Sequence, residues 1–341
     1  MSHPAAIPPF AAAPPAAAPA APSAAPSAAP AAAPPAAATA SPAAAPPASP
    51  PAAPRNEQGQ TLQEFLAAYN PDRYRHPSHT VDMAVMTVAN GKLKLLLIRR
   101  RNHPFLGCWA TPGGFVALGE DLDRAALREL KEETGLDQGI YFRQLYTLGK
   151  ADRDPRTHVI TTAYITLAPA QALLQARAGD DAADAAWFTV STRVLREDDR
   201  SRVTELTLAR DAPAPAPAAI VYTITETVVD NWKRVRSAPD AARSTACLAG
   251  DHIKIVNMAV SLVREHALTT GLIFNMLPPA FLLSELQHAF EGVTGKTVNK
   301  PNFRRDVVAK KLVVPTGDTR FYYGRPVPLY AANRLYRYTD F

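Results

Sequence analysis

Glutamates gather in one short part of the chain, the run Gly114–Leu136, which reads GFVALGEDLDRAALRELKEETGL. It contains Glu120 and, further on, Glu129, Glu132 and Glu133. Carboxylates this close together repel one another unless a positive charge lies among them. Because carboxylate oxygens are ligands that suit Mg²⁺ and Mn²⁺, the run indicates a divalent cation site.

A helix is expected to position these carboxylates. The segment Asp121–Glu133 is rich in Ala, Leu, Arg and Glu and contains neither Pro nor Gly. We therefore expect a helix that Asp121 caps and that ends at Gly135 in a left-handed turn. The last three glutamates are spaced so that all of them can reach one metal cluster. Arg128 lies four positions before Glu132 and can hold that carboxylate in place.

The run Gly114–Leu136 resembles the Nudix box at all of the defining positions. A merely solvated glutamate-rich helix would need neither the glycines nor this spacing. The resemblance implies an α/β/α sandwich and a metal-dependent hydrolase of nucleoside diphosphates linked to another group. It also implies that Mg or Mn binds between the box glutamates, that Arg128 orients them, and that a general base stands in the box or in a later acidic loop. The metal ligands would be Glu129, Glu132 and Glu133, the catalytic residues would be Glu120, Arg128 and Glu129, and Asp180 or Asp181 is the alternative base.

Segments around the box supply candidates for ligand binding. Two strands are expected at His79–Ala89 and Leu93–Arg99, and Asn90-Gly91 between them is a strong hairpin signal. Gly113 and Gly114 let the backbone turn sharply into the site. The loop Asp152–Arg156 is either a solvated turn or similar to the loop that borders the ligand in Nudix proteins that recognise ADP-ribose. The ligand-binding candidates are Arg99, Gly113, Gly114, Arg153, Asp154 and Arg156.

Composition limits the remaining possibilities. The chain has 341 residues, yet residues 1–54 contain no Lys, Arg, Asp or Glu and are almost wholly Ala and Pro. Such a segment cannot form a core, so we expect a disordered tail that is not a secretory signal. No apolar run approaches the roughly 20 residues that a membrane span needs. The two cysteines, Cys108 and Cys247, make neither a disulfide framework nor a zinc site, which fits a reducing cytoplasm.

Strand signals continue beyond the box. Tyr141–Leu148 and Thr157–Leu167 are strand-like, and Gly179–Phe188 resembles the acidic loop and final strand common in the Nudix fold. A Nudix domain is therefore expected over residues 60–190. Val203–Ala209 and Ile220–Val229 alternate like the strands of an inserted hairpin, and residues 236–245 look like a linker. Residues 191–250 are accordingly interpreted as an inserted hairpin plus linker.

The C-terminal part of the chain is basic. Between Lys296 and Arg337 it carries ten Lys or Arg and two acids, in a chain whose overall net charge is +6. Clustering of this kind indicates a polyanion partner. Helical patterns at Asp251–Leu268, Phe281–Val293 and Pro301–Lys311, followed by short strands, predict a winged helix-turn-helix domain over residues 251–341. Asn299 can cap the third of these helices, whose Phe303, Val307 and Val308 are expected in the core.

The segments LLSELQHAF, KTVNKPNFRRDVVAKKLVVPTG and GRPVPLY resemble the DNA-binding half of the Nudix-related regulators of NAD metabolism. That resemblance implies operator DNA as a partner. A symmetric dimer on a palindromic site would supply enough contacts. The alternative is a basic face that binds RNA, a membrane or an acidic protein, or that is simply solvated. Lys300, Asn302, Arg304 and Arg305 would face bases, and Lys310, Lys311, Arg320 and Arg325 would face phosphates.

Two functions are consistent with these patterns. The first is a cytoplasmic, ligand-responsive regulator whose Nudix domain binds ADP-ribose or a related nucleotide and still hydrolyses it slowly. The second is an ADP-ribose pyrophosphatase whose C-terminal domain is not a regulator. The intact glutamate set keeps hydrolysis open, and the basic winged helix favours the regulator because a purely catalytic protein does not need one.

Overall fold

The computed structural model describes residues 53–136, 139–170, 182–211, 218–230, 232–269, 271–322 and 324–335. The expected disordered tail, apart from its last two residues, and the alternative bases Asp180 and Asp181 lie outside these ranges. The chain divides into two units, Met1–Pro71 and Asp72–Phe341. In the first unit, helix α1 (Leu62–Ala68) begins with a capping box between Thr61 and Glu64. The 3-10 turn η1 (Pro71–Arg73) follows it.

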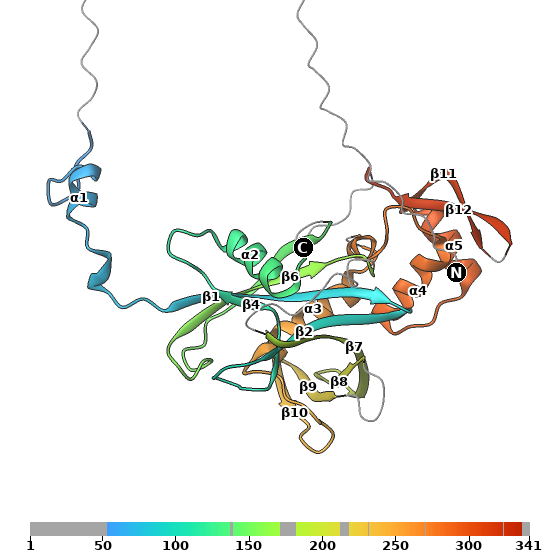
Figure 1. Cartoon of the computed structure of the whole chain (residues 1–341), viewed down its shortest axis with the longest axis horizontal. Coiled ribbons are helices and arrows are strands. Elements are labelled where there is room, and N and C mark those ends of the chain that lie inside the picture. The colour runs from blue at the N-terminus through green and yellow to red at the C-terminus, as the bar shows by residue number, and fades with distance from the viewer. Residues whose placement is uncertain are drawn as a thin grey trace, which may run out of the picture. The chain divides into compact units, whose positions relative to one another are not determined.

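A ten-stranded sheet forms the framework of the second unit (Figure 1). Its order is β10-β9-β8-β7-β2-β1-β6-β5, with β3 paired to β2 and β4 paired to β1. Strands β1 and β6 run parallel, whereas the other described pairs are antiparallel. The strands are β1 (Ser78–Ala89), β2 (Lys92–Arg100), β3 (Trp109–Ala110), β4 (Gly113–Phe115), β5 (Tyr141–Leu148), β6 (Val159–Leu167), β7 (Ala182–Glu197), β8 (Ser201–Arg210), β9 (Ala219–Val229) and β10 (Trp232–Pro239).

The hairpin between β1 and β2 confirms the turn that the sequence predicts. Asn90 and Gly91 have φ angles of 52° and 65°, as a two-residue type I′ turn requires. Both strands are buried on two faces, since helices cover the sheet on each side. Along β1 the buried residues alternate between two apolar clusters, Val81, Met83 and Val85 in one, Ala84, Met86 and Val88 in the other.

Helices α2 (Leu122–Thr134) and α3 (His252–His266) contribute to opposite clusters and complete the α/β/α sandwich. Helix α2 ends at Gly135 in the left-handed conformation, as expected. Helix α3, which the sequence analysis assigned to the winged-helix domain, packs on the sheet as well as against α4 (Leu283–Thr294) and η3 (Leu272–Met276). The apolar side of α3 enters the same cluster as one face of β1, because that face of the sheet would otherwise be exposed. The α3 residues in this cluster are Ile253, Ile255, Val256, Ala259, Val260 and Val263.

The two strands predicted at Val203–Ala209 and Ile220–Val229 are confirmed as β8 and β9, which pair antiparallel, but they belong to the main sheet. Strand β7 continues to Glu197, and β8, β9 and β10 extend the same sheet beyond it. The expected linker at residues 236–245 begins inside β10. The boundary at residue 190 is therefore not where the strand ends, because Val190–Val194 pairs in register with residues 204–208 of β8. The tip of the expected hairpin lies outside the described residues.

The winged helix consists of the 3-10 helix η3 (Leu272–Met276), α4 (Leu283–Thr294), α5 (Lys300–Ala309) and the two-stranded wing β11 (Val313–Tyr322) and β12 (Arg325–Ala332). Asn299 caps α5 and accepts a hydrogen bond from the Asn302 N–H, as predicted. Phe303 and Val307 are buried, but Val308, which was expected in the core, is 44% exposed. None of the described helices is both long and apolar enough to cross a membrane.

The winged helix packs directly on the end of the β1–β2 hairpin. A Cβ atom added at Gly292 in α4 would lie 2.5 Å from the carbonyl oxygen of Gly91. Helix α4 also contacts α3, and Phe303 and Val307 of α5 belong to the same apolar cluster as the sheet. The two domains therefore share a continuous core, and the hairpin turn requires a glycine opposite it.

Candidate functional site

A polar cavity of about 560 Å³ opens beside the amino end of β1 and the helix α2. Six segments line it. They contribute Thr80 and Asp82 from β1; Ile98 and residues 100–105 from β2 and the following loop; Thr111, Gly113, Gly114 and Phe115 around β4; Arg128, Glu129 and Glu132 from α2; Arg153, Asp154, Arg156 and Val159 from the loop before β6; and Gly250, Asp251 and His252 at the start of α3. The cavity has the size of a nucleotide-binding site.

Arg128 is the centre of the polar network on the α2 side of the cavity. Its guanidinium donates two hydrogen bonds to the Glu120 carboxylate, both of 2.8 Å, and one to Glu129 Oε1 at 2.7 Å. It also donates to Glu132 Oε2 at 3.2 Å and to the Phe115 carbonyl at 3.1 Å. The Arg128 side chain, followed by the Ala117 N–H, lowers the pKa of Glu120 to about 2. The structure thus brings Arg128 together with three of the four box glutamates.

The three predicted metal ligands differ in whether they line the cavity. Glu129 and Glu132 line the cavity, whereas Glu133 is buried and accepts a hydrogen bond of 2.6 Å from the Gly113 N–H. Burial raises the pKa of Glu129, and Arg128 opposes that shift. Among the residues that the structure describes, no group of three or more His, Cys, Asp or Glu is already gathered as a metal site.

The donor chemistry and the backbone nevertheless suit a hard cation. The available donors are carboxylate oxygens, which Mg²⁺ and Mn²⁺ prefer. A Cβ atom added at Gly114 would lie 2.2 Å from Glu129 Oε1, so the glycine leaves room for this carboxylate beside the cavity. Gly113 is packed more tightly, because a Cβ atom there would lie 2.1 Å from the backbone oxygen of Val81.

Arg99, which the sequence analysis named as a ligand-binding candidate, lies on the other face of the strand from the cavity-lining residues. Arg99 does not line the cavity, and its Nε donates to the Gly107 carbonyl at 3.1 Å. Its neighbours Ile98 and Arg100 line the cavity instead, because successive side chains of a strand point to opposite faces. Arg101, in the loop after β2, lines it as well.

The loop before β6 contributes a mixed-charge wall. Arg156 donates to both oxygens of Asp154, at 3.0 and 2.8 Å, and lies over the ring of Phe115 at 5.1 Å from its centroid. The hydrogen bonds from Arg156 lower the pKa of Asp154. Arg153 forms a largely buried ion pair with Asp251, with Nη2 2.9 Å from Oδ1. The expected residues Arg153, Asp154 and Arg156 therefore all border the cavity.

The sequence analysis did not identify three polar residues that line the cavity, Asp82, Thr111 and His252. Asp82, in the middle of β1, is only 7% exposed and accepts a 2.5 Å hydrogen bond from the Thr161 hydroxyl. The Thr111 N–H donates to Nδ1 of His252 at 3.2 Å, and the Thr111 hydroxyl is 2.7 Å from the same nitrogen. Burial lowers the pKa of His252, so the imidazole is neutral at pH 7. The position of Asp82, an acidic residue within a mostly apolar strand, was the one sequence feature that could have marked it as a site residue.

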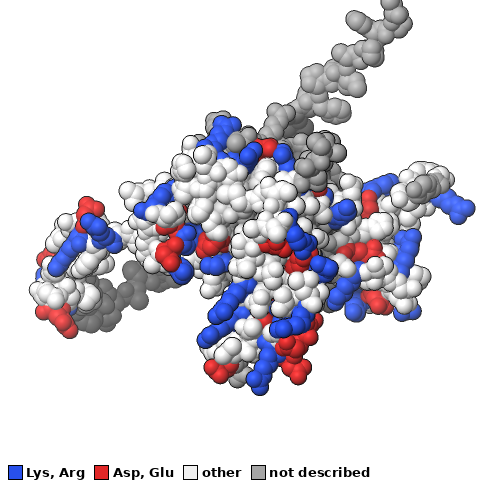
Figure 2. Space-filling model, turned by 90° about the horizontal axis from the view of Figure 1, so that it is seen from below, with Lys and Arg blue, Asp and Glu red and all other residues white. Residues whose placement is uncertain are grey.

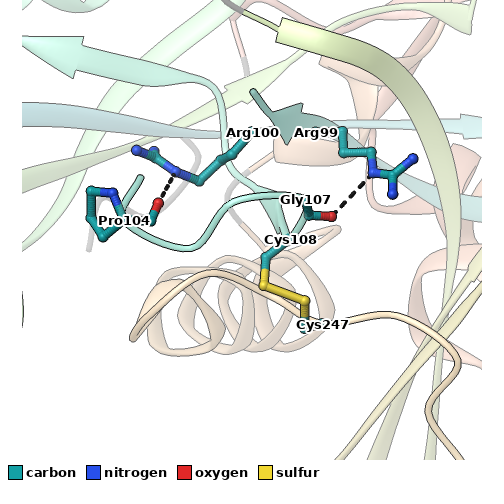
Figure 3. Close-up of a disulfide and its surroundings, with 6 residues drawn as sticks. All are labelled: Arg99, Arg100, Pro104, Gly107, Cys108 and Cys247. Carbon is teal, nitrogen blue, oxygen red and sulfur yellow. Dashed lines mark hydrogen bonds between the residues drawn. A yellow bond between two sulfur atoms is a disulfide. The ribbon is translucent and has the colours of Figure 1, made fainter. Parts of the chain in front are cut away.

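The cysteines also differ from the prediction. Cys108 and Cys247 form a disulfide, with their Cα atoms 4.9 Å apart, although the sequence indicated no disulfide (Figure 3). They are 139 positions apart, and no local pattern reveals that the segment before α3 returns to the loop after β2. Parallel pairing between Trp109 and Leu248 brings these two segments together.

The basic residues of the winged helix mostly face outward. Arg304 is half-buried, and Arg320 is held by Glu285, 2.7 Å from its carboxylate, so Arg320 attaches the wing to α4. The molecular face drawn in Figure 2 carries Lys and Arg in separate groups with Asp and Glu between them, not as one continuous basic surface. The exposed members of the predicted DNA-binding set are Lys300, Asn302, Arg305, Lys310, Lys311 and Arg325.

Two parts of the chain match known protein families. Residues 78–206 match the family model of the NUDIX domain, and residues 273–332 match that of the NrtR DNA-binding winged helix domain. The second match begins after α3, in agreement with the packing of that helix on the sheet.

One curated relative aligns with most of the chain, and another aligns with about a third of it. The chain is 30% identical over 270 residues to the ADPR responsive transcriptional repressor NtrR of Acinetobacter baylyi, covering 79% of this chain and 87% of that protein. It is 43% identical over 118 residues to an ADP-ribose pyrophosphatase of Methanocaldococcus jannaschii, covering 35% of this chain and 65% of that protein.

Solved structures show the same arrangement. A MutT/nudix family protein from Enterococcus faecalis is similar with a TM-score of 0.58 and 26% identity, over 81% of this chain and 95% of that one. Shewanella oneidensis NrtR complexed with a 27mer DNA has a TM-score of 0.50 and 29% identity, over 74% of this chain and 93% of that one.

Proposed function

The chain belongs to the family of NrtR transcriptional regulators, which join a Nudix domain to a winged helix, and from this premise we propose that ADP-ribose in its Nudix cavity controls operator binding. The relative from Acinetobacter baylyi is an ADPR-responsive repressor. Repression is accordingly the direction that we infer for this chain. A DNA-bound regulator acts where the DNA is, which for this protein would be the cytoplasm.

One observation carries this proposal: the cavity and the winged helix are joined by elements that reach both. Strand β1 lines the cavity at Thr80 and Asp82, and its hairpin turn lies against Gly292 of α4. The start of helix α3 places Asp251 and His252 in the cavity, and the same helix contacts α4. A ligand that favours one arrangement of these elements would shift the winged helix.

The charges around the cavity fit a nucleoside diphosphate derivative. Arg100, Arg101, Arg153 and Arg156 line it and can meet phosphate oxygens. Asp82 accepts hydrogen bonds, and a carboxylate of this kind suits a sugar hydroxyl. ADP-ribose carries both groups, which supports it as the ligand.

We also propose that the Nudix domain hydrolyses ADP-ribose slowly to AMP and ribose 5-phosphate. Glu129, Glu132 and Glu133 would hold Mg or Mn, which when bound would neutralise the diphosphate and activate water. Arg128 would position Glu129 and Glu132, and Glu120 would fix Arg128. Glu129 is the candidate general base within the described residues.

For DNA binding, we propose that α5 enters the major groove and that two copies of the chain bind a palindromic operator. Lys300, Asn302, Arg304 and Arg305 would meet base edges, while Lys310, Lys311 and Arg325 would contact phosphates.

A gel-shift experiment tests the proposed function. DNA from upstream of the protein's own gene neighbourhood is incubated with the full chain, with and without ADP-ribose and Mg²⁺. We expect a specific complex that ADP-ribose dissociates. A complex that forms but ignores ADP-ribose, NAD and AMP at millimolar concentration would contradict ligand control.

Two neighbouring glycines provide a matched prediction about the site. Gly114→Ala should displace the Glu129 carboxylate and reduce hydrolysis by about tenfold or more, while the free energy of unfolding changes by less than about 1 kcal/mol, because only the end of a side chain must move. Gly113→Ala should destabilise the fold by about 3 kcal/mol, because backbone atoms of β1 obstruct the new Cβ. Urea unfolding measures the stability of the two variants, and AMP release measures their hydrolysis. Equal losses of stability in the two variants would contradict the different roles assigned to the two glycines.

A further inference from the structure

The disulfide between Cys108 and Cys247 joins two walls of the ligand cavity. Cys108 ends the loop that follows β2, and residues 100–105 of that region line the cavity. Cys247 lies just ahead of Gly250, Asp251 and His252, which line the opposite part. Figure 3 shows the bond bridging the loop that carries Pro104 and Gly107 to the segment bearing Cys247.

Backbone hydrogen bonds and apolar contacts also join these walls. The Trp109 N–H donates to the Cys247 carbonyl at 2.8 Å, and the Ala249 N–H donates to the Trp109 carbonyl at 2.7 Å. Next to them, Phe105 lies against Gly250, where an added Cβ atom would be 3.2 Å from its ring. Within the loop, Arg100 Nε donates to the Pro104 carbonyl at 2.8 Å. The disulfide adds a covalent link from this loop to the segment before α3.

The bond is accessible to small molecules. Cys247 is exposed and Cys108 is half-buried. These are the only two cysteines of the chain, so neither has another partner within the same chain. In a reducing compartment such a bond is seldom purely structural, and a chain with a core of this extent does not depend on one crosslink for folding.

We propose that Cys108 and Cys247 form a reversible thiol–disulfide switch that sets the affinity of the cavity for its ligand. This inference rests on the proposed function only for the identity of that ligand. The disulfide state holds both walls in place before the ligand arrives, so less conformational entropy is lost on binding. The dithiol state leaves the loop free to move away from the start of α3 and binds the same ligand more weakly.

The chemistry needs only a small-molecule thiol and a peroxide. For reduction, an external thiolate attacks Sγ of exposed Cys247; the bond between the two protein sulfurs breaks, and Cys108 leaves as a thiolate that takes up a proton. A second thiol attacks the mixed disulfide, forming the small-molecule disulfide and freeing Cys247. For oxidation, one protein thiolate takes an oxygen atom from peroxide, which gives a sulfenic acid and hydroxide. The other thiolate attacks the sulfenic sulfur and displaces a second hydroxide to form the disulfide, and each hydroxide takes up a proton to become water.

Amide hydrogen exchange on the full chain tests the switch without any ligand. The peroxide-treated protein is compared with protein reduced by a dithiol, and thiol labelling with a maleimide counts the free cysteines in each sample. We expect amides in residues 103–108 and 247–252 to exchange at least about tenfold faster after reduction, while β6 stays unchanged. Failure of the disulfide to form, or identical exchange in both states, would overturn the switch.

Ligand binding supplies the second readout. Calorimetry with ADP-ribose should give an affinity about tenfold higher for the oxidised protein than for the reduced one. Cys108→Ser plus Cys247→Ser should match the reduced protein and ignore both reagents; if this variant does not fold, reduction and reoxidation of the natural chain give the same comparison. Equal affinity in the two states overturns the switch. Exchange that changes with redox state while ADP-ribose binds neither state supports the switch and contradicts the proposed ligand.

Discussion

Replacing both Glu132 and Glu133 by glutamine should lower ADP-ribose hydrolysis at least about a thousandfold. The change removes the negative charge from two of the three proposed metal ligands but keeps the shape of their side chains. Glutamine at position 133 keeps an oxygen that can accept the hydrogen bond from the Gly113 N–H, and residue 132 is largely exposed. The fold should therefore persist, and operator affinity should change by less than about twofold because α2 lies in the sandwich and not in the winged helix.

Release of AMP under single-turnover conditions measures this effect. Glu197→Gln plus Glu226→Gln, on β7 and β9, is a matched control that removes two negative charges away from the cavity and should retain full turnover. If the Glu132 and Glu133 variant kept more than about a tenth of the natural rate, these carboxylates would not be the metal ligands.

Replacing Lys300 and Arg305 by alanine should weaken operator binding by about a hundredfold or more. Both side chains are exposed on α5, so they are available to the groove, unlike half-buried Arg304. A direct base contact contributes about 1–3 kcal/mol, and each lost phosphate contact reduces the salt slope by about one. ADP-ribose binding should not change, because α5 does not line the cavity.

Fluorescence anisotropy with a labelled operator at several salt concentrations measures both quantities. The control is Arg234→Ala plus Arg236→Ala, which removes two positive charges from the exposed strand β10. Equal losses in the two variants would show that net charge, and not α5, determines DNA binding. An unchanged affinity for the Lys300 and Arg305 variant would contradict the winged-helix interface.

Local signals predicted the elements that depend on neighbouring residues. The Asn90-Gly91 turn, the end of α2 at Gly135 and the cap of α5 at Asn299 each require a few adjacent residues, and all three are confirmed. The Nudix sandwich and the winged helix follow from motifs of similar extent. Trp109, a few residues before the box, is buried and packs edge-on against Phe188.

Features that depend on distant contacts could not be predicted in this way. The amphipathic pattern of α3 is the same whether the helix packs on a winged helix or on the sheet, so the pattern alone could not show that the helix contacts both. Its placement in turn determines that Asp251 and His252 line the cavity and that Cys247 meets Cys108. The sequence analysis named Arg99 as a ligand-binding candidate, whereas Arg100 lines the cavity. This difference has a simpler cause, because neighbouring residues of a strand place their side chains on opposite faces.

The most direct test of ligand control measures ADP-ribose binding with and without operator DNA. The Glu132→Gln plus Glu133→Gln chain is used, so that the ligand is not consumed during the titration. Coupling between two sites is reciprocal. If the cavity controls the winged helix, saturating operator should weaken ADP-ribose binding by the same factor, about tenfold or more, by which ADP-ribose weakens operator binding. One dissociation constant for ADP-ribose, whether the operator is present or absent, would contradict that control.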